Sequence, residues 1–387
     1  MAATLAASST AGLTPPFEDQ PAPFMNITGL GNGTFIVAMS NGTTTTMSLN
    51  ATTATPTARG TGRTRSTTIT LEPMTLPSGD AVPQIPTPEA ASQSASSSAT
   101  PTSTATPSAA PDRVKFGGVN IAGFDFHCKT NGTCRLDETM DVMSNGTAMQ
   151  QMEHFVKDDG LNTFRLPVSW QYLVNDQLGG PLDANNLAAY DKLVQGCLAS
   201  GAELCIIDVH NYARWNGGII GQGGPSNEQF TSLWSQLASK YASEPKIAFD
   251  IMNEPHDLDI SVWAETVQKA VSAIRDAGAT QQIILLPGTD YMSAKTFVSS
   301  GSAQVLSLVK NPDGTFDNLV FNVHAYLDYD RSGTHAECVT NNIDEAFGPL
   351  AQYLRENKRT AMLTETGGGP NDESCMKYLC EQMEFMK

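Results

Sequence analysis

Residues 246–256 read KIAFDIMNEPH, an apolar run of the β type that ends at Glu254 and Pro255. Residues 360–367, TAMLTETG, repeat the arrangement and place Glu365 directly after a second such run. In a parallel α/β barrel or open sheet, the carboxyl ends of the strands gather at one face, where catalytic groups lie. The two runs therefore predict a parallel α/β fold that brings together two carboxylates from distant parts of the chain.

Runs of this kind recur from residue 112 onward, and most gaps between them have the apolar spacing of an amphipathic helix. Alternating strands and helices predict parallel strands joined by right-handed crossovers. We therefore expect a (β/α)8 TIM barrel over residues 112–387, with a doubly wound sheet as the alternative. The predicted strands span residues 117–122, 162–168, 203–209, 246–252, 282–287, 318–323 and 360–364.

The predicted strands are one short of a closed barrel. A barrel that lacks a strand has an open edge, with unpaired backbone groups and exposed core side chains. We therefore expect a barrel that is C-terminally incomplete, truncated before its eighth strand and lacking about one βα repeat of roughly 40 to 60 residues.

The cysteines number seven, an odd set, and none precedes residue 128. Three disulfides are expected, which leaves Cys380 either as a free thiol or as the partner of a cysteine in the missing repeat. The expected pairs are Cys128 with Cys134, Cys197 with Cys205, and Cys338 with Cys375.

Residues 1–111 differ in composition from the rest of the chain. Residues 81–111 are mostly Ser, Thr, Ala and Pro without an aromatic residue, so they cannot bury enough apolar surface to offset the entropy of ordering. We expect a disordered Ser/Thr/Pro-rich region and linker, of the composition found in O-glycosylated stalks. Within it, only the alternation in residues 24–49 is typical of a hairpin.

Charge and glycosylation signals indicate where the chain acts. Because 40 acidic residues outnumber 23 basic ones, giving a net charge of −17, nucleic acid and anionic membrane are excluded as partners, and no apolar run is as long as a membrane span. The Asn-x-Thr sequons and the cysteines favour an extracellular, secreted protein, although residues 1–12 lack signal-peptide character. The sequons begin at Asn26, Asn32, Asn41, Asn50, Asn131 and Asn145.

Polar side chains collect at the ends of the predicted strands. Arg165 lies inside an apolar run, where a charge is costly unless paired, so it is expected to face a carboxylate and lower its pKa. Each such residue also has a plain structural interpretation, such as a turn, a cap or a satisfied core histidine. Their coincidence at one face of one barrel favours catalysis, and two carboxylates are what retaining glycoside hydrolysis requires.

Other chemistries lack their motifs. No Gly-x-Ser-x-Gly elbow marks a serine hydrolase, and the glycine-rich residues 221–225 lack the Lys-Ser/Thr of a phosphate loop. His210, His256 and His324 are not spaced as zinc ligands. We therefore expect no metal and no cofactor.

Five segments resemble glycoside hydrolase family 5, and in particular its secreted fungal endo-β-1,4-glucanases. They are FRLPV (164–168), DVHNYARW (208–215), IMNEPH (251–256), HAYLD (324–328) and LTETGGG (363–369). The resemblance extends from about residue 114 to the end of the sequence. It implies Glu254 as general acid/base and Glu365 as nucleophile, with carboxyl groups about 5 to 5.5 Å apart.

The resemblance also implies roles for the residues around the two glutamates. These are Arg165 beside the nucleophile, His210 in the sugar subsite, Asn253 on the substrate 2-hydroxyl, His324 on Glu254 and Tyr326 on Glu365. Aromatic side chains that stack on sugar faces would line the cleft. The candidates are Trp215, Trp170 and Tyr291, the last at a position where such fungal enzymes usually have tryptophan.

We therefore expect a retaining endo-β-1,4-glucanase, a cellulase that hydrolyses internal bonds of cellulose and related glucans by double displacement. It would act as a monomer on a β-1,4-glucan. The alternatives are an endo-β-1,4-mannanase of the same family and an inactive truncated fragment that only binds glycan.

Overall fold

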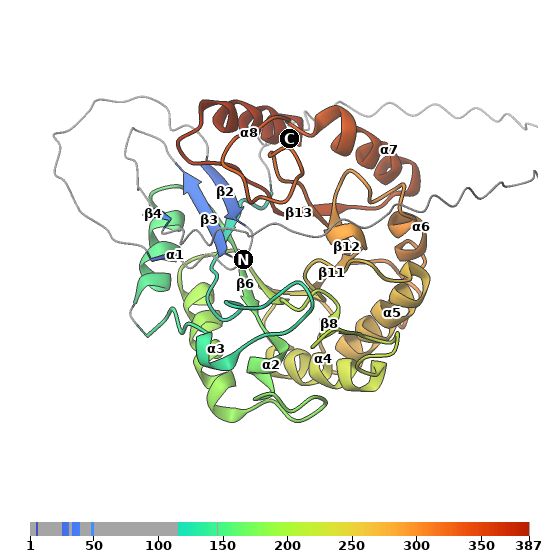
Figure 1. Cartoon of the computed structure of the whole chain (residues 1–387). Helices are drawn as coiled ribbons and strands as arrows, with labels where there is room; N and C mark the ends of the chain where they lie inside the picture. Colours follow the sequence, from blue (N-terminus) through green and yellow to red (C-terminus); the bar gives the residue numbers. More distant parts are fainter. Residues whose placement is uncertain are drawn as a thin grey trace, which may run out of the picture. The chain divides into compact units, whose positions relative to one another are not determined.

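The computed structural model describes residues 115–144 and 146–386, together with four short strands before residue 50 (Figure 1). Strand β1 (Leu5–Ala6) pairs with β4 (Ser48–Leu49), and β2 (Met25–Leu30) pairs with β3 (Gly33–Ala38), both antiparallel. The β2–β3 pair confirms the hairpin predicted within residues 24–49. The predicted linker and the sequons at Asn32, Asn41, Asn50 and Asn145 lie outside the described residues.

A parallel sheet of seven strands forms the centre of the region from residue 115 onward. The strands lie side by side in the order in which they occur along the chain, and all their pairings are parallel. A doubly wound sheet would reverse its strand order at a switch point, so that alternative is excluded. The strands are β5 (Gly118–Asn120), β6 (Thr163–Val168), β7 (Leu204–Val209), β10 (Ile247–Asp250), β11 (Ile283–Pro287), β12 (Leu319–His324) and β13 (Ala361–Glu365).

The first and last strands of this sheet lie close together. Asn120 Nδ2 on β5 donates a hydrogen bond of 3.0 Å to the carbonyl oxygen of Thr364 on β13. An open sheet would hold these two strands at opposite edges, so the contact shows that the sheet curves into a nearly closed barrel. The α/β barrel predicted from the strand pattern is confirmed, with every predicted strand in place.

Helices surround the barrel (Figure 1). Side-chain caps fix the first turns of several helices, such as Asp259 before α5 and the Ser226–Gln229 capping box before α4. Their apolar faces pack on the outward side chains of the strands in one large core. The helices are α1 (Thr147–Lys157), α2 (Trp170–Leu173), α3 (Ala184–Ala199), α4 (Asn227–Tyr241), α5 (Ile260–Asp276), α6 (Ser302–Leu306), α7 (Gly348–Asn357) and α8 (Glu373–Phe385).

Shorter elements complete the connections. A two-stranded ribbon, β8 (Arg214–Trp215) with β9 (Gly218–Ile219), follows β7. The turns η1 (Leu136–Glu138), η2 (Asp290–Met292) and η3 (Ile343–Phe347) lie in other loops. Two of these elements, β8 and η2, carry aromatic side chains that were predicted to line the cleft.

The inside of the barrel changes from apolar to polar along the strands. Alternate strand residues point inward, and near the strand starts Leu204, Ile206, Ala248 and Leu285 form a small apolar cluster. Further along the same strands, Asp208 on β7 and Asp250 on β10 are completely buried. Buried carboxylates are stable only with donors around them, so the carboxyl ends of the strands must hold a polar network.

All three predicted disulfides are present, Cys128–Cys134, Cys197–Cys205 and Cys338–Cys375. The second joins α3 to β7, and the third joins the loop after β12 to α8. Cys380 is a free, exposed cysteine on α8. Within the described part of the chain, no helix is both long and apolar enough to cross a lipid bilayer.

Candidate active site

Glu254 and Glu365 meet at the carboxyl ends of the strands. Glu254 follows β10, and Glu365 is the last residue of β13. A carboxylate oxygen of each and a ring nitrogen of His324 all lie within 4.8 Å of one another. Retaining glycosidases hold their carboxyl groups about 5 to 5.5 Å apart, whereas inverting enzymes need roughly 6.5 to 9.5 Å for a water. The separation fits an acid/base and nucleophile pair.

The backbone at Glu254 is strained. Its φ is 43°, in the left-handed region that residues with a side chain rarely adopt. Its N–H donates to Sδ of Met292 at 3.1 Å instead of continuing a strand ladder. The chain turns sharply after Asn253 and presents the Glu254 carboxylate to the barrel mouth.

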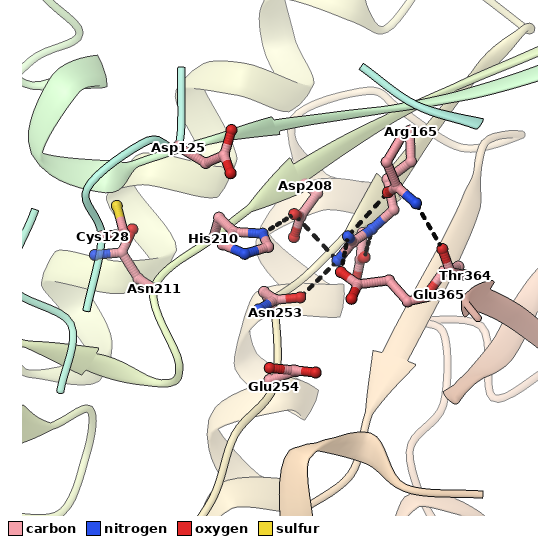
Figure 2. Close-up of polar contacts among 12 residues, drawn as sticks. Asp125, Cys128, Arg165, Asp208, His210, Asn211, Asn253, Glu254, Thr364 and Glu365 are labelled. Carbon is pink, nitrogen blue, oxygen red and sulfur yellow. Dashed lines mark hydrogen bonds and ion pairs between the residues drawn. The ribbon is translucent and has the colours of Figure 1, made fainter. Parts of the chain in front are cut away.

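Arg165 on β6 is the centre of the polar network (Figure 2). It is 2% exposed, and each nitrogen of its guanidinium has at least one oxygen partner. The partners are Asp250 Oδ2, 2.9 Å from Nε; Glu365 Oε1 and Asn120 Oδ1, 2.6 and 3.1 Å from Nη1; and Asn253 Oδ1 and Asp208 Oδ2, 2.9 and 3.1 Å from Nη2.

The charge of Arg165 is secured by its neighbours. Burial by itself lowers the pKa of Arg165, but the carboxylates of Asp208, Asp250 and Glu365 outweigh it and raise that pKa above its ordinary value. The prediction that Arg165 faces a carboxylate is confirmed, with three carboxylates in place of one.

Glu365 is held as a carboxylate. The Tyr326 hydroxyl donates to Oε2 at 2.6 Å, and Arg165 donates to Oε1 at the same distance. Burial raises the pKa of Glu365, but His324, Arg165 and His210 together lower it to about 2. The group is therefore mainly ionised above that pH, the form that a nucleophile requires.

His210 contributes a second positive charge. Its Nδ1 lies 2.7 Å from Asp208 Oδ2, and Asp125 lies beside it (Figure 2). Burial alone lowers the pKa of His210, but Asp208 and Asp125 raise it to about 9. The imidazole is therefore protonated at neutral pH and can only donate hydrogen bonds.

The side-chain amide of Asn253 has a hydrogen-bond partner at its oxygen but none at its nitrogen among the described residues. Its Oδ1 accepts from Arg165, while Nδ2 is buried and has no hydrogen-bond partner among the described residues. The side chain is fixed by Arg165, and its amide N–H groups remain available to an acceptor in the cleft, such as a sugar hydroxyl.

The aromatic candidates divide into exposed and buried side chains. Tyr291 is 43% exposed and stacks on His256 at 4.3 Å between ring centroids, which leaves its other face open. Trp215 on β8 is half-buried. Trp170 is fully buried, edge-on to Trp215 at 5.2 Å and packed on Phe230. A buried indole presents no face to a sugar, so the prediction that Trp170 lines the cleft is corrected: Trp170 packs edge-on against Trp215.

Several members of the network were not assigned a role from the sequence. Asp208, Asp250, Asn322 and Thr364 lie on four strands and contact Arg165, His324 or each other. The signal in the sequence was a polar residue inside an otherwise apolar strand, as at Asp250 in IAFD. Such a residue needs a partner inside the barrel.

Among the residues that the structure describes, two groups of side chains have the donor types of a metal site. They are Glu254 with His324 and Glu365, and Asp328 with Asp330 and His335. The Asp328 oxygens already accept from the backbone N–H groups of Gly333, Thr334 and His335, which orders that loop. We assign neither group a metal.

Known proteins are similar to this chain in sequence and in fold. Residues 118–387 match the family model described as Cellulase (glycosyl hydrolase family 5). The chain is 61% identical over 280 residues to "Endoglucanase EG-II" of Hypocrea jecorina, an alignment that covers 70% of this chain and 66% of the relative. The chain thus spans slightly less than two thirds of that relative's length.

Solved structures of similar proteins have the same fold as this chain. The crystal structure of Cel5A (EG2) from Hypocrea jecorina has a TM-score of 0.69 and 61% sequence identity, covering 71% of this chain and 85% of that one. The structure of XacCel5A in complex with cellopentaose has a TM-score of 0.62 and 31% identity, covering 70% of this chain and 84% of that one.

Proposed function

The chain belongs to glycosyl hydrolase family 5, and we propose that it is a retaining endo-β-1,4-glucanase that cleaves internal bonds of cellulose and related glucans. The observation that carries this proposal is the pair of carboxylate oxygens from Glu254 and Glu365 within 4.8 Å. The relative named as an endoglucanase and the cellopentaose complex of a neighbour support the substrate class.

In the first step, the Glu365 carboxylate attacks the anomeric carbon while Glu254 protonates the glycosidic oxygen. The carbon–oxygen bond to the leaving sugar breaks, and a glycosyl ester on Glu365 forms. Arg165 and Tyr326 hold both Glu365 oxygens. They fix the direction of attack and keep the group ionised before the substrate arrives.

In the second step, Glu254 has become a carboxylate and acts as the base. It takes a proton from water, the water oxygen attacks the same anomeric carbon, and Glu365 leaves as a carboxylate. Two inversions give net retention. Both steps use the same two glutamates, so a water-sized gap between them is not needed.

The remaining side chains would bind the sugar. The unpartnered Nδ2 of Asn253 and the protonated His210 supply donors for sugar hydroxyls at the cleaved bond. Tyr291 and Trp215 supply flat apolar surfaces for pyranose faces. All of these residues come from one chain, which supports a monomeric enzyme.

We also propose that the enzyme works outside the cell. Its three disulfides are typical of an oxidising compartment, and its net charge of −17 disfavours polyanionic partners. The proposed substrate is a neutral polysaccharide, with which this charge does not interfere.

The test is the release of reducing ends from carboxymethylcellulose and from mannan, by the chain and by its Glu365→Gln variant. Glucan-selective release that falls by roughly 10⁴-fold or more in the variant is expected, and proton NMR of the first product should show the β anomer. Release from mannan alone would identify a mannanase. An unchanged rate in Glu365→Gln would contradict the assigned nucleophile.

A further inference from the structure

We propose that Thr364 and Asn322 are positioning residues that fix the tautomer of His324, so that its Nδ1 shares a single proton with Glu254. The inference rests on the proposed function, because it concerns the acid/base of that reaction. Its basis is a chain of four hydrogen bonds inside the barrel, which runs from Asp250 through Asn322 and Thr364 to His324 and then to Glu254.

The series of hydrogen bonds begins at a buried carboxylate that can only accept hydrogen bonds. Asp250 is completely buried; its Oδ2 accepts from Arg165 Nε at 2.9 Å and its Oδ1 from Asn322 Nδ2 at 2.8 Å. Neither partner has an acceptor to offer, since a guanidinium and an amide NH₂ only donate. Asp250 is therefore ionised in this arrangement, and the Asn322 amide must turn its NH₂ group toward it.

The orientation of the Asn322 amide determines the direction of the next hydrogen bond, the one with Thr364. With NH₂ facing Asp250, the Oδ1 of Asn322 faces the Thr364 hydroxyl, 2.5 Å away. A carbonyl oxygen cannot donate, so the single hydroxyl proton of Thr364 lies between these two atoms. Toward its other neighbour, His324 Nε2 at 3.0 Å, the hydroxyl can only accept. Nε2 of His324 therefore carries a hydrogen in every charge state of the ring.

The consequence appears at the other ring nitrogen. Nδ1 of His324 lies 2.9 Å from Glu254 Oε1 and 3.6 Å from Glu365 Oε2. One proton fits between Nδ1 and Glu254. It lies on Glu254 when the ring is neutral and on Nδ1 when the ring is cationic. If that proton is lost, the Nδ1 lone pair faces the Glu254 carboxylate, which is unfavourable.

This arrangement serves both steps of a retaining reaction. A proton on Glu254 is available for the glycosidic oxygen in the first step. The bare carboxylate then faces a lone pair, which favours uptake of a proton from the attacking water in the second step. If His324 could move its hydrogen from Nε2 to Nδ1, it would donate to the carboxylate and weaken Glu254 as a base.

Other charged groups lie near these four hydrogen bonds and affect the protonation of their members. His324 faces Glu254 after β10 and Glu365 on β13, and Asp250 faces Arg165 and Asp208 inside the barrel. Burial raises the pKa of Asp250 to about 6, although Arg165 opposes the shift. All four hydrogen bonds therefore form above about pH 6, where Asp250 is ionised. The tautomer of His324 should be measured at pH 7.5.

Two variants of Thr364 separate the hydroxyl from the shape of the side chain. Thr364→Val keeps the volume but removes the acceptor for Nε2–H, whereas Thr364→Ser keeps the hydroxyl. The readout is long-range ¹⁵N–¹H correlation of histidine-labelled protein, with His324 assigned by its loss in His324→Asn. We expect a protonated Nε2 in the unsubstituted chain and in Thr364→Ser, and hydrogen on Nδ1 with none on Nε2 in Thr364→Val.

The kinetic counterpart is the pH profile of kcat/KM on a soluble cello-oligosaccharide. Without the hydroxyl, the shared proton should be lost at lower pH, so the alkaline limb of Thr364→Val should move down by about one pH unit while that of Thr364→Ser stays. An Nε2 without hydrogen in the unsubstituted chain would overturn the inference, as would a Thr364→Val variant with unchanged tautomer and profile. The NMR readout needs no activity, so it decides the inference even if glucan is not hydrolysed.

Discussion

Nη1 of Arg165 lies 2.6 Å from Oε1 of Glu365, although 200 positions separate the two residues in the chain. The same guanidinium also contacts Asp208 and Asp250. One buried cation therefore balances the proposed nucleophile and two interior carboxylates. The site and the stability of the barrel depend on the same side chain.

Replacing Arg165 should unfold the barrel more readily. Arg165→Met leaves the buried carboxylates of Asp208 and Asp250 without their cation, so the free energy of unfolding should fall by about 3 to 5 kcal/mol. Arg135→Met is the control, because Arg135 is 55% exposed and pairs with Asp137 and Glu138 at the surface, where an ion pair contributes little to stability. Urea denaturation followed by circular dichroism measures both, and equal losses would contradict the prediction.

Removing the Tyr326 hydroxyl should change the pH profile. Tyr326→Phe deletes the hydrogen bond to Glu365 Oε2, so the pKa of Glu365 should rise from about 2 toward its ordinary value of about 4.3. The acid limb of kcat/KM should move to higher pH, with a rate loss of roughly 10- to 100-fold. Tyr190→Phe removes a buried hydroxyl that donates to the Leu166 carbonyl, and its acid limb should not move.

His210 should make stability depend on alkaline pH. Its pKa of about 9 in the folded protein lies above the ordinary value of about 6.5. The stabilisation is therefore complete below about pH 6.5 and lost as pH rises through about 9. Between these values the melting temperature of the unsubstituted chain should fall by a few °C more than that of His210→Gln. Parallel curves for the two proteins would show that the charge of His210 does not stabilise the fold.

Tyr291 should affect substrate binding more than chemistry. Stacking of a flat face on the ring contributes about 0.5 to 1.5 kcal/mol, so Tyr291→Ala should raise KM for cello-oligosaccharides by roughly 2- to 10-fold with little change in kcat. Phe316→Ala is the control, since Phe316 is 42% exposed, close to the 43% of Tyr291, but precedes β12 at the opposite end of the barrel. The same rise in KM for both variants would contradict the prediction that Tyr291 binds sugar in the cleft.

The local pattern of the sequence identified the strands and the residues at their ends. All seven predicted strands are in the sheet, and Glu254 and Glu365 lie at the predicted face. The three disulfides also form as predicted. These features depend on apolar runs, on the breaks between them and on short spacings, so a linear chain displays them directly.

The side chains that meet inside the barrel depend on the register of the strands and on the curvature of the sheet. Asp208, Asp250, Asn322 and Thr364 each look like an isolated polar residue in an apolar strand, and nothing nearby in sequence shows that they share partners. Trp170 likewise follows a strand end but turns into the core. Alternation along a strand determines which residues share a face, whereas closure of the barrel determines which of them touch across it. The sequence thus determined the two carboxylates, and only the tertiary structure decided the network that sets their charge.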